Sequence, residues 1–303
     1  SANKTIIFEE VSNRLKMDGY NTYWISPSQN WTKWLISNNI LAECILNLPE
    51  KVINISSAVL SKDELKEISH IEVTNKISFR DIYLMDRVLR EKNSNYSLRY
   101  MLRCFNEVSN FLIDNRVICL FSEQTWNFEI ISTLACNSIG INSYYVDGVK
   151  VPDGGDLGRF TFYLGYNQDS LALNEKPITS NFEFAKKFLI DYRKKRQGTV
   201  YLKTHFNPPA LKMDWPKKFV KHLVYLFNDK HDLTRRPIIS LIEYRLKQLF
   251  TFLIVKISNT FETSKLIPSK YVLIALHKPD DSALDVQSSS YINQIEAIKA
   301  FIR

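Results

Sequence analysis

The sequence YVLIALHKPDDSALDVQSSSYINQ, residues 271–294, decides the fold that we expect for the whole chain. Its first six residues are apolar and uncharged, which is typical of a parallel strand buried on both faces. The strand ends at the titratable cluster HKPDD, residues 277–281, and a polar loop then leads into a segment with helical apolar spacing. Because ligands of open α/β sheets bind at the carboxyl ends of the strands, this cluster is a candidate binding site.

A second unit of this kind lies in the N-terminal half of the chain. The apolar run RVICLF, residues 116–121, predicts a strand, residues 127–138 predict a helix that stops at Gly140, and residues 141–146 predict the next strand. This succession indicates a βαβ unit with a right-handed crossover. Glu123 and Asp147 each follow one of these strands, so we expect both, together with His277, to face one cleft.

The remaining apolar patterns complete an α/β chain. Further strands are predicted at residues 5–8, 21–25 and 51–59. Ser61 and Glu64 have the spacing of a capping box, so a helix is expected to begin there. Helices are also predicted at residues 80–115 and, with a break near Pro237, at 214–261. The expected fold class is therefore α/β, with a doubly wound, mostly parallel sheet.

A glycine-rich loop is predicted at residues 147–160, where four of the eight glycines of the chain lie. Lys150 and Arg159 belong to this loop, at the carboxyl end of a predicted strand, where polar side chains can converge on a ligand. The chain has neither GxGxxG nor GxxxxGK[ST], which argues against a dinucleotide-binding dehydrogenase and a P-loop enzyme.

Charge and cysteine content limit the partners of the chain. The net charge of +8 favours an anionic partner, but no zinc-finger spacing or RNA-binding aromatic signature supports nucleic acid. The four cysteines form no CxxC pair, which is typical of reduced cysteines in a cytoplasmic protein. Since there is no HExxH or similar cluster of metal ligands, we expect no protein-bound metal.

Membrane contact is a further possibility that the sequence leaves open. No signal peptide and no run of 18 apolar residues is present, so the expected location is cytoplasmic. Residues 213–258 carry nine basic and four acidic residues among many apolar ones. A basic amphipathic helix pair of this kind either docks on an anionic membrane surface, here the inner membrane, or packs on a neighbouring domain.

Two segments of the sequence resemble a known protein family. The pattern of YV, apolar run, LHxPDxS, polar loop and YxNQ in residues 271–294 resembles bacterial capsular-polysaccharide biosynthesis proteins, which are GT-B-type glycosyltransferases. The family more often has Gln-Pro-Glu where this chain has Lys278, Pro279 and Asp280. The succession of a helix, GINSYYV and a loop ending in GRF, residues 158–160, is a second, independent resemblance.

The resemblance implies a GT-B-like organisation. Residues 1–265 would form the Rossmann-like, acceptor-side domain, with a helical segment at 213–261. Residues 266–303 would begin the donor-binding domain, which needs well over a hundred residues, so the chain is expected to be a fragment or to complete the first sheet instead. If it is a fragment, we expect it to bind sugar nucleotide weakly or not at all.

The resemblance also implies a function and roles for individual residues. The expected activity is transfer of a sugar from a nucleotide-sugar donor to a growing capsule or lipopolysaccharide glycan, free or lipid-linked, without any other cofactor. Glu123 is the first candidate for the catalytic base or nucleophile and Asp147 the second. The candidate substrate-binding residues are Lys150, Arg159, His277, Asp280 and Gln294. The alternative is a non-catalytic polysaccharide-binding or assembly-scaffold protein with this fold; an epimerase is disfavoured by the missing glycine fingerprint.

Overall fold

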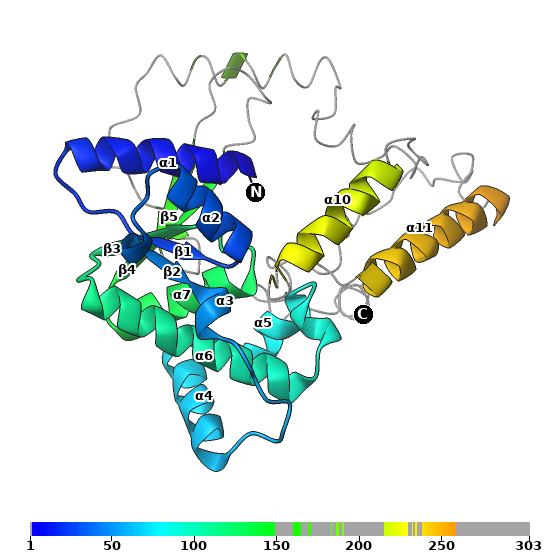
Figure 1. Cartoon of the computed structure of the whole chain (residues 1–303), viewed down its shortest axis with the longest axis horizontal. Coiled ribbons are helices and arrows are strands. Elements are labelled where there is room, and N and C mark those ends of the chain that lie inside the picture. Colours follow the sequence, from blue (N-terminus) through cyan, green and yellow to red (C-terminus); the bar gives the residue numbers. More distant parts are fainter. Residues whose placement is uncertain are drawn as a thin grey trace.

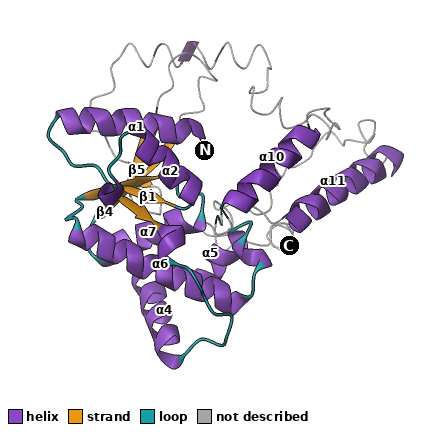
Figure 2. Ribbon diagram, viewed as in Figure 1, coloured by secondary structure: helices purple, strands orange, loops and turns teal. Residues whose placement is uncertain are grey.

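A computed structural model describes residues 2–148, 160–164, 169–170, 183, 186–187, 190, 215–229, 232, 234 and 238–258 (Figures 1 and 2). The N-terminal elements are α1 (Ala2–Met17), β1 (Trp24–Ser26), α2 (Gln29–Ser37), η1 (Ala42–Cys44), β2 (Ile45–Asn47), α3 (Leu48–Lys51), α4 (Lys62–Asn75), α5 (Phe79–Met85) and η2 (Leu89–Glu91). They are followed by α6 (Ser94–Asp114), β3 (Cys119–Ser122), α7 (Asn127–Ser138), β4 (Asn142–Gly148), β5 (Phe160–Leu164), β6 (Asp169–Ser170), α10 (Trp215–Asn228) and α11 (Ile238–Ser258).

The described strands form two small sheets. β1 pairs in parallel with β2, and β3 pairs in parallel with β4, while β4–β5 and β5–β6 are antiparallel. In Figure 1 the strands lie between α1 and α2 on one side and α6 and α7 on the other. The α/β class predicted from the sequence is confirmed, and the described part is mostly helical (Figure 2). The predicted doubly wound, mostly parallel sheet is not seen among the described residues, because two of their four strand pairings are antiparallel.

The predicted βαβ unit is present as β3, α7 and β4. Its helix has the predicted bounds and ends before Gly140, whose φ of +76° is a conformation that glycine adopts without strain. The helix is buried over most of its length because its apolar side chains face both the strands and α6. In α6 the buried residues recur every three or four positions, as expected of a helix with one face in the core. These are Ser97, Tyr100, Met101, Leu102, Cys104, Phe105, Val108 and Leu112.

Two predicted strands are wrong. Residues 5–8 belong to α1, because an apolar run of four residues cannot be distinguished from a helix segment by periodicity, and no glycine or proline interrupts the chain before Gly19. Residues 51–59 form no strand; the strand is the earlier β2, and Pro49 then starts α3. The predicted strand at 21–25 is confirmed in part as β1.

Arg99 explains why residues 52–60 have no strand structure. Its guanidinium donates hydrogen bonds to the backbone carbonyls of Ser56, Ala58 and Val59, so these groups are paired with a side chain of α6. The same guanidinium binds the Glu64 carboxylate through Nε (2.6 Å) and Nη2 (3.0 Å). Arg99 thus binds the backbone carbonyls that a neighbouring strand would bind if residues 51–59 formed the predicted strand.

The predicted capping box at the start of α4 is confirmed and is joined to this arginine. Ser61 Oγ accepts from the Glu64 backbone N–H (3.1 Å), and Glu64 Oε2 accepts from the Ser61 N–H (2.7 Å). The hydrogen bond from Arg99 is the main cause that lowers the pKa of Glu64 from 4.5 to about 2. The negative charge of Glu64 therefore stabilises the folded state.

We expect Glu64→Gln to lower the free energy of unfolding at pH 7 by about 1 kcal/mol, because the lost ion pair is partly exposed. Since the folded-state pKa is depressed, the contribution of Glu64 is complete above about pH 4.5 and disappears as the pH falls towards 2. Urea denaturation from pH 7 to pH 2 should show the two proteins converging over that window. Asp63→Asn is the matched control, since Asp63 is 96% exposed. A constant difference down to pH 2 would contradict this assignment.

Candidate functional site

The carboxyl ends of β3 and β4 form the sheet edge at which the sequence predicts the catalytic candidates Glu123 and Asp147. In the parallel pair Ser122 lies opposite Tyr145, so Glu123, the next residue after β3, reaches the same edge as the last residues of β4. The backbone of Asp147 lies two residues beyond Tyr145. Glu123 and Asp147 therefore share one edge of the sheet, as the βαβ pattern predicts, and their chemical roles stay predictions.

The first two residues of the loop predicted at 147–160 belong to a strand instead. Asp147 and Gly148 still belong to β4, where they lie opposite Thr161 and Phe160 of the antiparallel β5. Antiparallel neighbours need only a loop between them, whereas a parallel strand would require a crossover. The other candidates, Lys150, Arg159, His277, Asp280 and Gln294, lie outside the described residues.

The turn between β3 and α7 holds its shape through buried polar contacts. Gln124 has a φ of +53°, a left-handed conformation that is uncommon for residues other than glycine. Its side chain is fully buried, and Nε2 donates to Thr133 Oγ1 at 3.1 Å, in the second turn of α7. This contact explains how the strained residue is held, and it leaves Glu123 at the start of the turn, partly buried at the sheet edge.

Glu129 is a second carboxylate at this turn, which the sequence analysis missed. Its Oε2 accepts from the backbone N–H of Thr125 (2.7 Å) and of Trp126 (3.0 Å) and from Thr125 Oγ1 (3.2 Å). The pKa of Glu129 is raised to about 7, chiefly by burial and also by the negative charge of Glu123, while the hydrogen bonds from Thr125 and Trp126 oppose the shift. A glutamate three positions after the residue preceding a helix is a recognisable cap signal, and it could have been found.

Asp86 secures the start of α7 from another part of the chain. This buried carboxylate accepts from the backbone N–H groups of Val88 and Leu89, both at 2.9 Å, through Oδ1. Its Oδ2 accepts from the side-chain Nδ2 of Asn127 at 2.6 Å and from the backbone N–H of Asn127 at 3.4 Å. Asp86 thus joins the segment after α5 to the first residue of α7, and no local sequence signal indicates this contact.

An arginine and a tryptophan meet beside this junction. The guanidinium of Arg87 lies 5.7 Å from the centroid of the Trp126 ring, within the range of a cation–π contact. Arg87 is exposed and Trp126 is partly buried. The positive charge therefore lies over the residue that precedes α7, next to the turn that carries Glu123 and Glu129.

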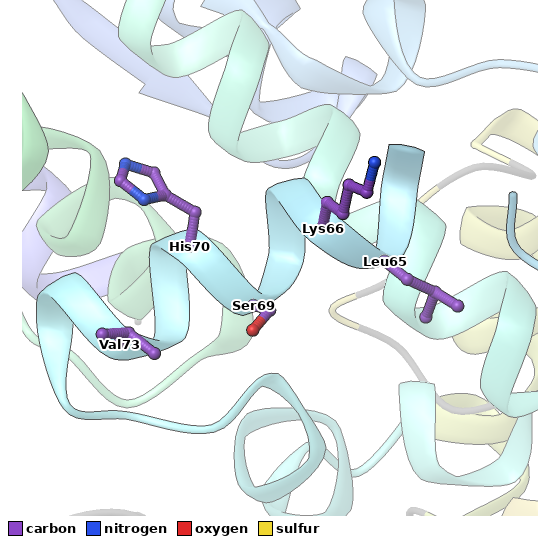
Figure 3. Close-up of a pocket in the computed structure, with 5 residues that line it drawn as sticks. All are labelled: Leu65, Lys66, Ser69, His70 and Val73. Carbon is purple, nitrogen blue, oxygen red and sulfur yellow. The ribbon is translucent and has the colours of Figure 1, made fainter. Parts of the chain in front are cut away.

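The hollow shown in Figure 3 is not part of this edge. Its lining residues all come from one face of α4, and the figure shows their side chains extending from that single helix. They are Leu65, Lys66, Ser69, His70 and Val73. Because no second element contributes a side chain to the lining, the hollow offers no enclosed site for a small molecule.

Cysteine and metal chemistry find little support in the described ranges. There, no group of three or more His, Cys, Asp or Glu side chains is placed to hold a metal ion. All four cysteines are unpaired, and burial raises the pKa of Cys104 and of Cys136 to about 12, so that both are thiols at neutral pH.

No family model, curated protein or solved structure matches the chain.

The pKa of Glu129 should respond to the charge of Glu123. We expect the side-chain carbon signal of Glu129, followed by NMR, to titrate near pH 7 instead of near 4.5. Because the charge of Glu123 raises this pKa, Glu123→Gln should shift the midpoint downwards, while Glu107→Gln on α6 should leave it unchanged. A midpoint near 4.5 in the wild type would show that Glu129 is not effectively desolvated.

Proposed function

We propose that this chain belongs to a GT-B-type glycosyltransferase that moves a sugar from a nucleotide donor to a growing capsule or lipopolysaccharide glycan. The observation that carries the proposal is the register of β3 and β4, which brings Glu123 and Asp147 to the carboxyl edge of a parallel pair. Ligands of open α/β folds bind at this edge. The resemblance in residues 271–294 supports a sugar nucleotide as the ligand.

In the proposed reaction, Glu123 accepts the proton of the acceptor hydroxyl. The hydroxyl oxygen then forms a bond to the anomeric carbon of the donor sugar, while the bond from that carbon to the phosphate oxygen breaks and the nucleotide leaves with the electron pair. A partly buried base at the end of a paired strand is suited to this step. Asp147 is the second candidate for the base.

Glu129 would support Glu123 by keeping the turn in place. Its carboxylate is held by Thr125 and Trp126, so it is a positioning residue. Raising the pKa of one carboxylate beside another is a common way in which enzymes separate acid and base roles. Lys150 and Arg159 are proposed to hold anionic groups of the substrates, and His277, Asp280 and Gln294 to hold the donor.

A donor screen tests the proposal. A purified protein containing residues 1–303 is incubated with a panel of sugar nucleotides, and release of the nucleoside mono- or diphosphate is measured with and without glycan acceptors. Release that requires the protein and is accelerated by an acceptor supports transfer. If glycans bind in calorimetry but no donor is consumed at any pH from 5 to 9, the protein is a non-catalytic polysaccharide binder instead.

A further inference from the structure

An apolar stripe runs along the exposed side of α11. Six large apolar side chains of this helix are 40–80% exposed: Ile239, Ile242, Leu246, Phe250, Leu253 and Ile254. Their spacing of three or four residues places them within an arc of about 120° on a helix about 31 Å long. Six exposed apolar side chains on one helix face are unusual for a surface that contacts only water.

The preceding helix, α10, presents a face that is both apolar and basic. Lys217, Val220, Lys221 and Val224 are exposed, and their spacing places all four on one side of the helix. No aspartate or glutamate occurs in α10. The Lys221 ammonium lies 5.9 Å from the centroid of the Tyr225 ring, within the range of a cation–π contact. The Lys221 side chain nevertheless remains exposed.

The one acidic residue in α10 and α11 forms an ion pair with a lysine of the same helix. α11 has one acidic residue, Glu243, at the margin of its apolar stripe, and Lys247 Nζ lies 2.6 Å from its Oε1. The two helices together carry six lysines and arginines against this one glutamate. Their combined charge of +5 is thus a large part of the net charge of +8.

A buried aspartate attaches this helical segment to the rest of the protein. Asp229 follows α10 directly and is 2% exposed. Its Oδ2 accepts from the backbone N–H of Asn30 at 3.0 Å, in the first turn of α2. Figure 1 shows α10 and α11 extending away from the strands. A surface that binds the two helices would therefore also hold the strand-containing part of the chain.

We propose that α10 and α11 dock on the surface of an anionic lipid bilayer. The apolar stripe of α11 enters the boundary between headgroups and acyl chains, and the lysines of α10 contact lipid phosphates. Among the described helices none has the length and hydropathy needed to cross a bilayer, so the expected mode is docking in the interface. The combined charge of +5 on the two helices favours an anionic surface over a second copy that carries the same positive charge. This proposal is independent of the transferase activity.

Vesicle co-sedimentation tests the docking. The wild-type chain should sediment with vesicles of equal parts phosphatidylcholine and phosphatidylglycerol, and should stay in the supernatant with phosphatidylcholine alone. Leu246→Glu with Phe250→Glu should weaken binding at least tenfold. Lys217→Gln with Lys221→Gln should weaken it about 25-fold, since each lysine near an anionic surface contributes about fivefold. Val73→Glu, at an exposed apolar position of α4, is the control and should bind as the wild type does.

Three results would overturn the proposal. The first is a wild-type chain that stays in the supernatant with the anionic vesicles. The second is a loss of specificity. Equal binding to both vesicle types would show that the lysines do not select anionic lipid, and an equal loss of binding in the Val73→Glu control would show that the stripe is not specifically involved. The third is a dimer by light scattering that Leu246→Glu with Phe250→Glu converts to a monomer, which would assign the stripe to a second copy of the chain. Circular dichroism of each variant verifies that the helices persist.

Discussion

Glu123→Gln is expected to lower turnover by about 10²- to 10⁴-fold and to leave the free energy of unfolding nearly unchanged. Glutamine keeps the shape and hydrogen-bonding capacity of the side chain but cannot accept the acceptor's proton. The residue directly follows β3, so its backbone position is fixed by the pairing of Ser122 with Tyr145. Turnover is measured with the donor and acceptor that the screen identifies, and stability by urea denaturation.

A purely structural role for Glu123 predicts a different pair of results. If its charge only favours the N-terminus of α7, then Glu123→Gln reduces stability by about 0.3–1 kcal/mol and turnover is retained. Glu129→Gln is the matched comparison, because Glu129 lies in the first turn of α7 and holds two backbone N–H groups. Wild-type turnover in Glu123→Gln would transfer the role of base to Asp147.

Much of the local structure could be predicted because its causes are local. The bounds of α7 follow from its apolar spacing and from Gly140, and the capping box follows from Ser61 and Glu64 alone. α11 begins at Ile238, directly after Pro237, whereas α10 already ends at Asn228, before the break that the sequence predicts near Pro237. The placement of Glu123 near Asp147 was predictable for the same reason, since two parallel strands joined by one helix must end at one edge.

The errors and omissions depend on contacts between residues far apart in sequence. Arg99 binds the carbonyl of Ser56, 43 positions away, and so holds as a loop a segment whose composition favours a strand. Asp86 binds Asn127 across 41 positions. No periodicity or spacing reveals such pairs, and a single sequence offers no other signal for them. The carboxylate of Glu129 could be predicted only in part. Its capping of Trp126 follows from local sequence spacing, but the desolvation that raises its pKa depends on the surrounding fold.

Asp86→Ala is expected to lower the free energy of unfolding by about 3 kcal/mol. The carboxylate is buried and receives hydrogen bonds from the backbone N–H groups of Val88, Leu89 and Asn127 and from Asn127 Nδ2. Alanine removes the acceptor for all four donors, and it leaves these buried groups with neither a protein partner nor water. Urea denaturation at pH 7 measures the loss, with Asp63→Ala at an exposed position as the control.

Asp86→Asn separates the two halves of this contact. Asparagine can still accept from Val88 and Leu89 through its amide oxygen, but its NH₂ group would face the NH₂ group of Asn127, so we expect about half of the loss seen with alanine. Amide hydrogen exchange should then accelerate at Asn127 while Val88 and Leu89 stay protected. Equal exchange at all three amides, or a loss in Asp86→Ala no larger than in Asp63→Ala, would show that Asp86 does not hold the start of α7. The geometry of the turn at Glu123 would in that case depend on Gln124 and Glu129 alone.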